Sequence, residues 1–251
     1  MRRMLVILVV LGVLIAPVAQ AQERPVTIRY FGWSFFLVTA ADGLRIAMDP
    51  FSNIGYTMPT VEADVVTVSH EHGDHNNVGL IRGMPRVVRG LGVGAADWNR
   101  IYERMGGTLI YAVPAFHDDV QGTSPRGLDT LFMIDSGGVR IAHLGDIGQP
   151  SLSEGQLRAL GAIDILMIPV GAGPFTVTPA QATAITAQIR PKIVIPMHYK
   201  TPERQPPTWP GIDERAFLEG KQNVRRLGSH TLTITRDQLP STTQIVVMGY
   251  Q

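Results

Sequence analysis

Cysteine is absent from the 251-residue sequence. Its absence excludes disulfide bonds, a lipid-modified N-terminal cysteine, a thiol nucleophile and a thiolate metal site. No Gly-x-Ser-x-Gly nucleophile elbow occurs either, and the glycine run at residues 90–94 lacks the spacing of a dinucleotide-binding fingerprint. Several common catalytic devices are therefore missing, and the search for a site turns to histidine and aspartate.

An excess of positive charge is also missing. The chain has 22 lysine and arginine residues against 21 aspartate and glutamate residues. Without residues 1–21, which contain two arginines and no acid, 22 minus 2 leaves 20 basic residues against 21 acidic ones, a net charge of −1. Nucleic-acid-binding domains carry a basic excess or stripe, and the short cluster of Arg82, Arg86 and Arg89 is interpreted as solvated surface. We therefore expect no nucleic-acid partner.

The one long apolar run lies near the N-terminus. It extends from Leu5 to Ile15, follows Arg2 and Arg3, and is followed by Ala19-Gln20-Ala21. This order predicts a secretory signal peptide over residues 1–21, because a membrane-spanning helix needs about 20 apolar residues. We expect a periplasmic or secreted bacterial protein with no stable membrane insertion after cleavage, and an uncleaved anchor is the alternative. The oligomeric state cannot be inferred from these features.

The remaining residues, 22–251, have the composition of one globular domain with many turns. Runs rich in Val, Ile, Thr and aromatic residues predict strands at residues 26–30, 34–39, 44–48, 64–68, 86–88, 108–113, 130–134, 139–143, 163–168, 192–196 and 231–235. Helices are expected at residues 78–81, 95–105, 153–160, 179–189 and 213–219. Strands that alternate with fewer helices predict an α/β (α+β) fold in which helices cover packed sheets.

Candidate metal ligands follow directly on predicted strands. Ligands gather at strand ends in such folds because loops leave the rigid core there. His70 and His72 are two residues apart, so an extended chain points both imidazoles to the same side. A single histidine is more often a hydrogen-bonded structural residue than a ligand, but the shared position at strand ends favours the ligand interpretation. The candidates are His70, His72, Asp74, His75, His117, Asp146 and His198, with Asp49 as a neighbour.

Two further histidines are interpreted differently. His143 lies within a predicted strand, three residues before Asp146, so we expect it in the core or behind the ligands. His230 has no comparable setting and is predicted to be structural.

The order His70-x-His72-x-Asp74-His75, then His117, Asp146 and His198, resembles the five-motif pattern of the metallo-β-lactamase superfamily. Residues 49–51, 114–117, 141–146 and 193–199 are similar to its branch of bacterial metal-dependent hydrolases that includes L-ascorbate-6-phosphate lactonase-like proteins. One departure is the run Ile147-Gly148-Gln149, where many relatives have Leu-Gly-His. The resemblance therefore implies no role for that third position.

The resemblance implies a four-layer αββα sandwich with metals at one edge of its sheets. His70, His72 and His117 would bind one metal ion, and Asp74, His75 and His198 would bind a second. Asp146 would bridge the two ions, and Asp49 would orient ligands from behind. This nitrogen-rich set suits two Zn²⁺ ions best and also admits Mn²⁺ or Fe.

The implied activity is hydrolysis of an ester, lactone or phosphoester bond in a small molecule. A hydroxide held between two zinc ions would attack, with Asp74 as the catalytic proton acceptor and donor. Tyr199 and Lys200 follow His198 directly, so we expect them at the rim as substrate contacts, beside a loop that contains Pro202 and Pro210.

Other functions would fit the same fold. Export favours a periplasmic β-lactamase, which hydrolysis of nitrocefin would reveal, although known enzymes of that kind lack a bridging aspartate at the position of Asp146. A di-iron oxidoreductase would use the same ligands, and metal analysis with a visible absorption spectrum would identify it. A non-catalytic binding module is disfavoured because the ligand set is intact.

The mature chain should begin at Gln22, because Ala19-x-Ala21 presents the small residues that signal peptidase requires. Mass spectrometry of periplasmic material should show the chain shortened by the first 21 residues. Recovery of the full-length species from membranes would contradict this prediction.

Overall fold

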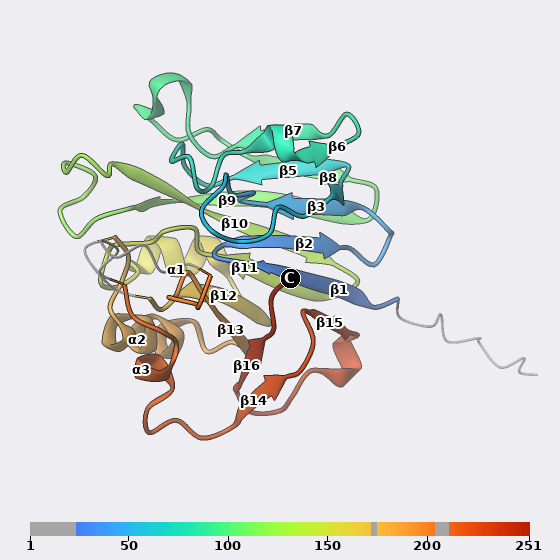
Figure 1. Cartoon of the computed structure of the whole chain (residues 1–251), viewed down its shortest axis with the longest axis vertical. Coiled ribbons are helices and arrows are strands. Elements are labelled where there is room, and N and C mark those ends of the chain that lie inside the picture. Colours follow the sequence, from blue (N-terminus) through green and yellow to red (C-terminus); the bar gives the residue numbers. More distant parts are fainter. Residues whose placement is uncertain (1–23, 172–174, 204–210) are drawn as a thin grey trace, which may run out of the picture.

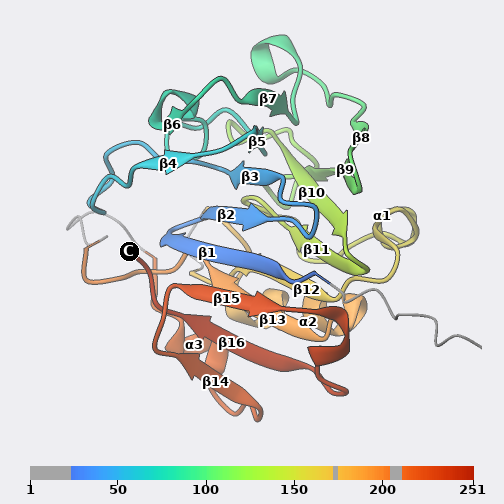
Figure 2. The ribbon, with the colours of Figure 1, turned by 90° about the vertical axis from the view of Figure 1, so that its right-hand side faces the viewer.

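The computed structural model describes residues 24–171, 175–203 and 211–251. Two large β-sheets face each other (Figure 1 and Figure 2). One sheet contains β1 (Val26–Gly32), β2 (Phe35–Thr39), β3 (Arg45–Met48), β5 (Val65–Val68), β7 (Arg86–Arg89) and β15 (Thr231–Ile234), in the order β15-β1-β2-β3-β5-β7. The other contains β8 (Tyr102–Met105), β9 (Thr108–Phe116), β10 (Leu128–Ser136), β11 (Val139–His143), β12 (Ile165–Pro169), β13 (Ile193–Met197), β14 (Val224–Leu227) and β16 (Gln244–Met248), in the order β14-β16-β13-β12-β11-β10-β9-β8.

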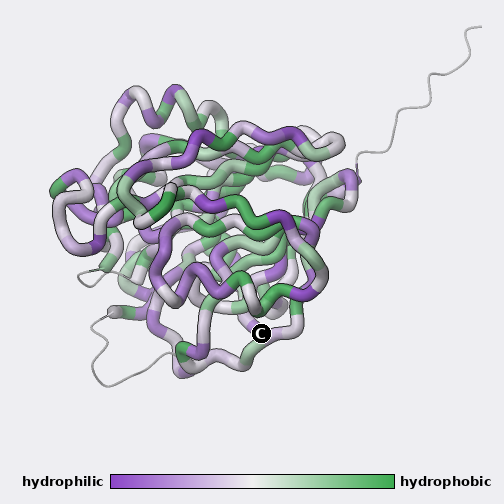
Figure 3. Tube along the Cα trace, turned by 90° about the horizontal axis from the view of Figure 1, so that it is seen from above, coloured by the Kyte–Doolittle hydropathy of each residue, from purple (hydrophilic) through white to green (hydrophobic). Residues whose placement is uncertain are grey.

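The main hydrophobic core lies between these sheets. Side chains on the inner faces are fully buried there, for example Ile28 of β1, Phe132 of β10 and Ile195 of β13. Figure 3 shows the hydrophobic strands running through the interior, with hydrophilic segments in many of the connecting loops. Burial of this much apolar surface is the main favourable contribution to folding, and it makes the two sheets a firm base for the loops at their edges.

Helices cover the outer face of the eight-stranded sheet. α1 (Glu154–Leu160), α2 (Pro179–Ile189) and α3 (Arg215–Leu218) contribute Leu160, Ile185 and Phe217 to a second core, together with outward-facing strand residues. Capping boxes begin the first two helices, Ser153 with Gln156 and Thr178 with Gln181. The predicted positions of these helices are confirmed within a few residues.

The outer face of the six-stranded sheet has a different cover. The 3₁₀ helix η1 (Val78–Leu80), the short β4–β6 pair (Val61–Glu62 and Ile81–Arg82) and the loop with Phe51 and Tyr56 pack there. The mixed fold with two packed sheets is therefore confirmed, and its fourth layer consists of these short elements. Two further 3₁₀ helices are η2 (Val93–Ala95) and η3 (Arg236–Gln238).

The helix predicted at residues 95–105 is wrong. Ala95 ends the 3₁₀ helix η2, residues 96–101 form a loop, and the segment ends in β8, which pairs with β9 in an antiparallel hairpin. Gly106, with φ of 60°, follows β8 directly, and glycine pairs are a known signal for a tight hairpin. Strands β14 and β16 were also missed by the sequence patterns.

Strand direction brings the predicted ligands to one edge. β1 and β3 both run antiparallel to β2, and β3 is parallel to β5, so β1, β3 and β5 all end on the same side (Figure 1). In the other sheet β11, β12 and β13 are parallel, and β9 runs with β11 because both pair antiparallel with β10. No helix among the residues that the structure describes is long and apolar enough to cross a membrane.

Gly148 is one of the residues near the site at which a side chain would collide with the backbone. A Cβ atom there would lie 2.4 Å from the carbonyl oxygen of His117, and its own N–H donates to Phe116 O at 2.9 Å. We expect Gly148→Ala to lower the free energy of unfolding by about 1–3 kcal/mol through overpacking, measured by urea denaturation. Gly155→Ala is the matched control, because Gly155 lies in α1 with only Ser153 Oγ near a new Cβ. An unchanged stability for Gly148→Ala would show that this contact can relax.

Candidate metal centre

Asp146 lies at the centre of the histidine cluster, in the loop after β11. Its Oδ2 atom is 3.0 Å from His198 Nε2, 3.2 Å from His75 Nε2, 3.4 Å from His117 Nε2 and 3.9 Å from His70 Nε2. Donor atoms that share a tetrahedral zinc ion at about 2.1 Å lie about 3.4 Å from one another. The spacing therefore suits ions placed between this carboxylate and the rings.

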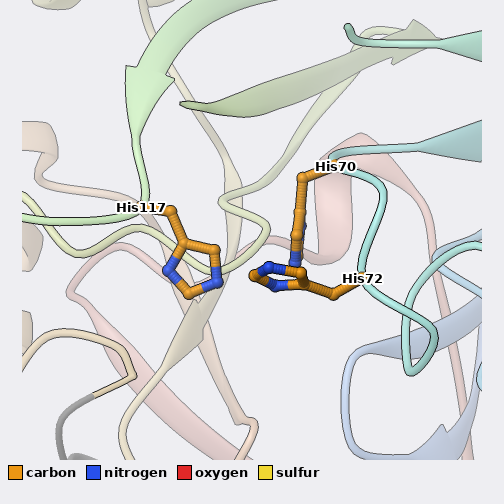
Figure 4. Close-up of side chains that lie close together, drawn as sticks. All are labelled: His70, His72 and His117. Carbon is orange, nitrogen blue, oxygen red and sulfur yellow. The ribbon is translucent and has the colours of Figure 1, made fainter. Parts of the chain in front are cut away.

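The remaining ligand candidates fall into two groups around this carboxylate. Ligand atoms of His70, His72 and His117 lie within 4.8 Å of one another (Figure 4), as do those of Asp74, His75 and His198. Figure 4 shows the first group assembled from two loops, one after β5 and the other after β9. This is the same division that the resemblance implied, and the binding of an ion by each group stays a prediction.

Buried ligand atoms without hydrogen-bond partners indicate whether the site suits a metal ion. His70 Nε2 and Asp146 Oδ1 are buried and have no hydrogen-bond partner among the described residues. Such orphaned groups cost roughly 1–3 kcal/mol each, and coordination to a cation would remove the cost. Burial raises the pKa of Asp146, but the imidazoles of His198 and His75 outweigh burial and hold it well below its usual value. The donor set therefore fits a divalent ion.

Asp49 sits behind the centre rather than in it. It also shares a possible three-residue group with His70 and His75, but its carboxylate accepts from Ser69 N at 2.8 Å and lies 3.1 Å from His75 Nδ1. Since His75 Nε2 faces Asp146 on the other side of the ring, Asp49 fixes the orientation of this imidazole. That arrangement agrees with the supporting role expected for Asp49.

Asp129 of β10 is a second buried carboxylate that the sequence patterns did not identify. Its Oδ1 lies 3.5 Å from His70 Nδ1, which is also 2.9 Å from Ser69 Oγ. Burial raises the pKa of Asp129 to about 7. Asp129 thus lies on the Nδ1 side of His70, without the hydrogen bond that Asp49 makes to His75, and its position is set by strand pairing and is not visible in sequence spacing.

Trp33 was also missed, because indole is not a ligand. It follows β1 at the same sheet edge, with φ of 56°. Its Nε1–H donates to Asp74 Oδ2 at 3.1 Å, its ring centroid lies 3.7 Å from that of His198, and its carbonyl accepts from His198 N at 2.9 Å. Trp33 could have been placed near the site from the sequence, because β1, which precedes it, ends at the same sheet edge as β3 and β5. Trp33 therefore supports one predicted ligand from each sheet.

The predicted rim residues lie elsewhere. Tyr199 is only 4% exposed and packs in the core beneath the helices, so its predicted contact with substrate is wrong. Lys200 is half-buried and, unlike Arg126, does not line the cavity at the centre. The backbone at His198 has φ of 52°, and the next residue, Tyr199, enters the core. Pro206, Pro207 and Pro210 of the predicted loop lie outside the described residues.

Three other residues have clear structural roles. His143 lies 2.9 Å from Ser34 O through Nε2 and accepts from Gly145 N through Nδ1, which confirms it as a core residue behind the ligands. His230 lies between β14 and β15, and its carbonyl accepts from Tyr30 N. Gln149, at the position where the sequence departs from many relatives, accepts from Phe116 N and donates to Ser151 O, so it braces the loops around His117.

A cavity of about 440 Å³ opens onto the centre. Five of the predicted ligands line it, together with residues that extend the wall beyond them: Trp33, Pro125, Arg126 and Phe175. Asp74 reaches this space with its side chain 27% exposed. A small molecule in the cavity would therefore contact both the ligand cluster and the opposite wall.

Comparisons with known proteins agree with this geometry. Residues 27–198 match the family described as Beta-lactamase superfamily domain. The chain is 33% identical over 202 residues to a UPF0173 metal-dependent hydrolase of Thermus thermophilus, and this match covers 70% of this chain and 84% of the relative. It is 29% identical over 208 residues to a UPF0173 metal-dependent hydrolase of Thermococcus kodakarensis, and that match covers 74% of this chain and 87% of the relative. A crystal structure from Thermotoga maritima, assigned to the Zn-dependent hydrolases of the metallo-β-lactamase superfamily, is similar with a TM-score of 0.69 and 30% identity, covering 90% of this chain and all of the other.

Trp33→Phe should weaken metal binding while it keeps an aromatic ring beside His198. The loss of the indole N–H frees Asp74, and removal of such supporting hydrogen bonds lowers metal affinity about 10- to 100-fold. Competition with a chromophoric chelator measures this affinity. Tyr102→Phe, at a side chain that is 75% exposed, is the control. Equal zinc affinity in Trp33→Phe and wild type would show that the indole has no positioning role.

Proposed function

This chain belongs to the β-lactamase superfamily and to the metal-dependent hydrolases within it, and we propose that it cleaves an ester, lactone or phosphoester bond in a small molecule with two zinc ions. The observation that carries the proposal is the single buried carboxylate of Asp146 between two three-residue groups of ligand atoms. A bridging carboxylate with ligands on both sides is the arrangement expected for two neighbouring ions. Mn²⁺ or Fe would fit the same donors.

The residues around the centre support hydrolysis. Bound divalent ions would supply Lewis acidity, which polarises a carbonyl or phosphoryl oxygen and lowers the pKa of water. Burial raises the pKa of Asp74, but His75 and His198 outweigh burial and lower it, which favours the ionised form that a metal ligand needs. Trp33 orients this carboxylate by donating to Oδ2, so that it would bind the second ion and also take a proton from the attacking water for transfer to the leaving group.

The substrate class follows from cavity size and charge. A volume of about 440 Å³ suits a small molecule, and the near-neutral sequence lacks the excess of basic residues that favours binding to a nucleic-acid backbone. We place the protein in the periplasm or among secreted proteins, since residues 1–21 have the pattern of a signal peptide. These N-terminal residues lie outside those that the structure describes.

A substrate screen tests the proposed function. Zinc-loaded mature protein should hydrolyse at least one lactone, thioester, aryl ester or phosphodiester faster than the protein stripped by chelation. Nitrocefin in the same panel tests the β-lactamase alternative. If single-stranded RNA is cleaved faster than every small ester and phosphoester, the proposed substrate class is wrong.

Asp146→Ala should lower metal content and activity together, because one carboxylate serves both proposed ions. Elemental analysis should find about two metal ions per wild-type chain and fewer in the variant. His230→Ala is the control, since His230 lies between β14 and β15 and belongs to neither ligand group. Unchanged metal content in Asp146→Ala would mean that this carboxylate bridges nothing.

A further inference from the structure

The cavity at the metal centre contains one permanent cation among its described lining residues, the guanidinium of Arg126. This side chain projects from the loop between β9 and β10, which begins with the ligand candidate His117. The cavity therefore has the ligand cluster on one wall and a positive charge on another.

The loop holds Arg126 in a fixed place relative to His117. The carboxylate of Asp118 accepts from the backbone N–H groups of Val120, Gly122 and Ser124 at 3.1, 2.7 and 3.0 Å. The loop closes where His117 N donates to Gly127 O at 3.1 Å. The carboxylate of Asp118 is thus occupied by hydrogen bonds within the loop, and these bonds fix the backbone from which Arg126 projects.

The guanidinium itself is held but not neutralised. Its Cζ atom lies 4.6 Å from the ring centroid of Phe175, a cation–π contact that orients the guanidinium plane. Its Nη1 atom is buried and has no hydrogen-bond partner among the described residues, and no described acid forms an ion pair with it. A buried donor without an acceptor is costly, so the site is built for an acceptor that a ligand would bring.

A second unsatisfied group lies nearby. A neighbouring cavity of about 320 Å³ shares His117, Arg126 and Phe175 with the first. Thr176 also lines it, is only 7% exposed, and its Oγ1 has no partner among the described residues. A hydroxyl donor and a guanidinium donor therefore border the same space, on the side away from the ligand cluster's Asp146 and together with Asp118 and Asp119, and two donors of this kind suit a group with two or more terminal oxygens.

We propose that Arg126 binds an oxyanion group of the substrate, a carboxylate or a phosphate, at a distance from the bond that is cleaved. This inference rests on the proposed hydrolase function and narrows its substrates to anionic molecules. It also gives to Arg126 the substrate contact that the sequence analysis predicted for Lys200. Phe175 is the platform that keeps the guanidinium facing the cavity.

Matched substrates test this assignment in the zinc-loaded enzyme. Para-nitrophenyl half-esters of dicarboxylic acids are compared with para-nitrophenyl alkanoates of the same chain length. Arg126→Gln should raise KM for the half-esters about tenfold or more and leave the alkanoates nearly unchanged, the pattern of lost ground-state binding. Arg126→Lys keeps the positive charge but loses the planar, two-pronged guanidinium, so its KM for the half-esters should lie between those of wild type and Arg126→Gln. Equal losses for both substrate series in Arg126→Gln would overturn the proposal.

Arg158→Gln is the matched control, because Arg158 is an exposed residue of α1 that pairs with Glu154. It should behave as wild type with both series. Lys200→Gln should also behave as wild type. A selective loss of half-ester binding in Lys200→Gln but not in Arg126→Gln would show that Lys200 binds the anion, and would overturn the proposal. Thermal unfolding of each variant confirms that differences in KM arise in folded protein.

Direct binding separates this proposal from the hydrolase function on which it rests. Calorimetry with glutarate and with inorganic phosphate, on zinc-loaded wild type and Arg126→Gln, requires no turnover. A loss of affinity in the variant for glutarate identifies a carboxylate site, and a loss for phosphate identifies a phosphate site. Unchanged affinity for both anions would overturn the proposal. If the wild type cleaves no ester, the hydrolase function fails while this measurement still decides the role of Arg126.

Discussion

The burial of one carboxylate, that of Asp146, among four imidazole nitrogens is the constraint on which the rest of the site depends. A buried charge is tolerated only when surrounding groups compensate it, so the chain has to deliver rings from both sheets to one point. This convergence requires unfavourable backbone conformations at three positions. Trp33, Asp49 and His198 each follow a strand directly, and they have φ values of 56°, 47° and 52°. Such conformations cost on the order of 1–3 kcal/mol each, and the packed sheets impose them.

Much of the site could be predicted because strand ends are visible in sequence. Asp49, His117 and His198 each follow an apolar run, and strand direction then places them at one edge. The supporting residues could not be predicted in this way. Asp129 reaches His70 through the pairing of β10 with its neighbours, and Trp33 reaches Asp74 across 41 residues of chain.

The errors have equally local causes. Residues 95–105 contain enough apolar side chains to suggest a helix, but the Gly106–Gly107 turn folds β8 back on β9. Tyr199 is adjacent to a ligand candidate, yet the turn at His198 sends it into the core. Arg126 gave no sequence signal, because its position depends on the hydrogen bonds that Asp118 makes within one loop. That loop contains both a candidate metal ligand and a candidate substrate contact, so the same loop would position the metal and the substrate.

The most direct test of the central claim is anomalous X-ray scattering at the zinc absorption edge, from crystals of the zinc-loaded protein. The account predicts two peaks per chain, one beside His70, His72 and His117 and the other beside Asp74, His75 and His198, with Asp146 between them. A single peak enclosed by Asp49, His70 and His75, the competing group of ligand atoms, would contradict it.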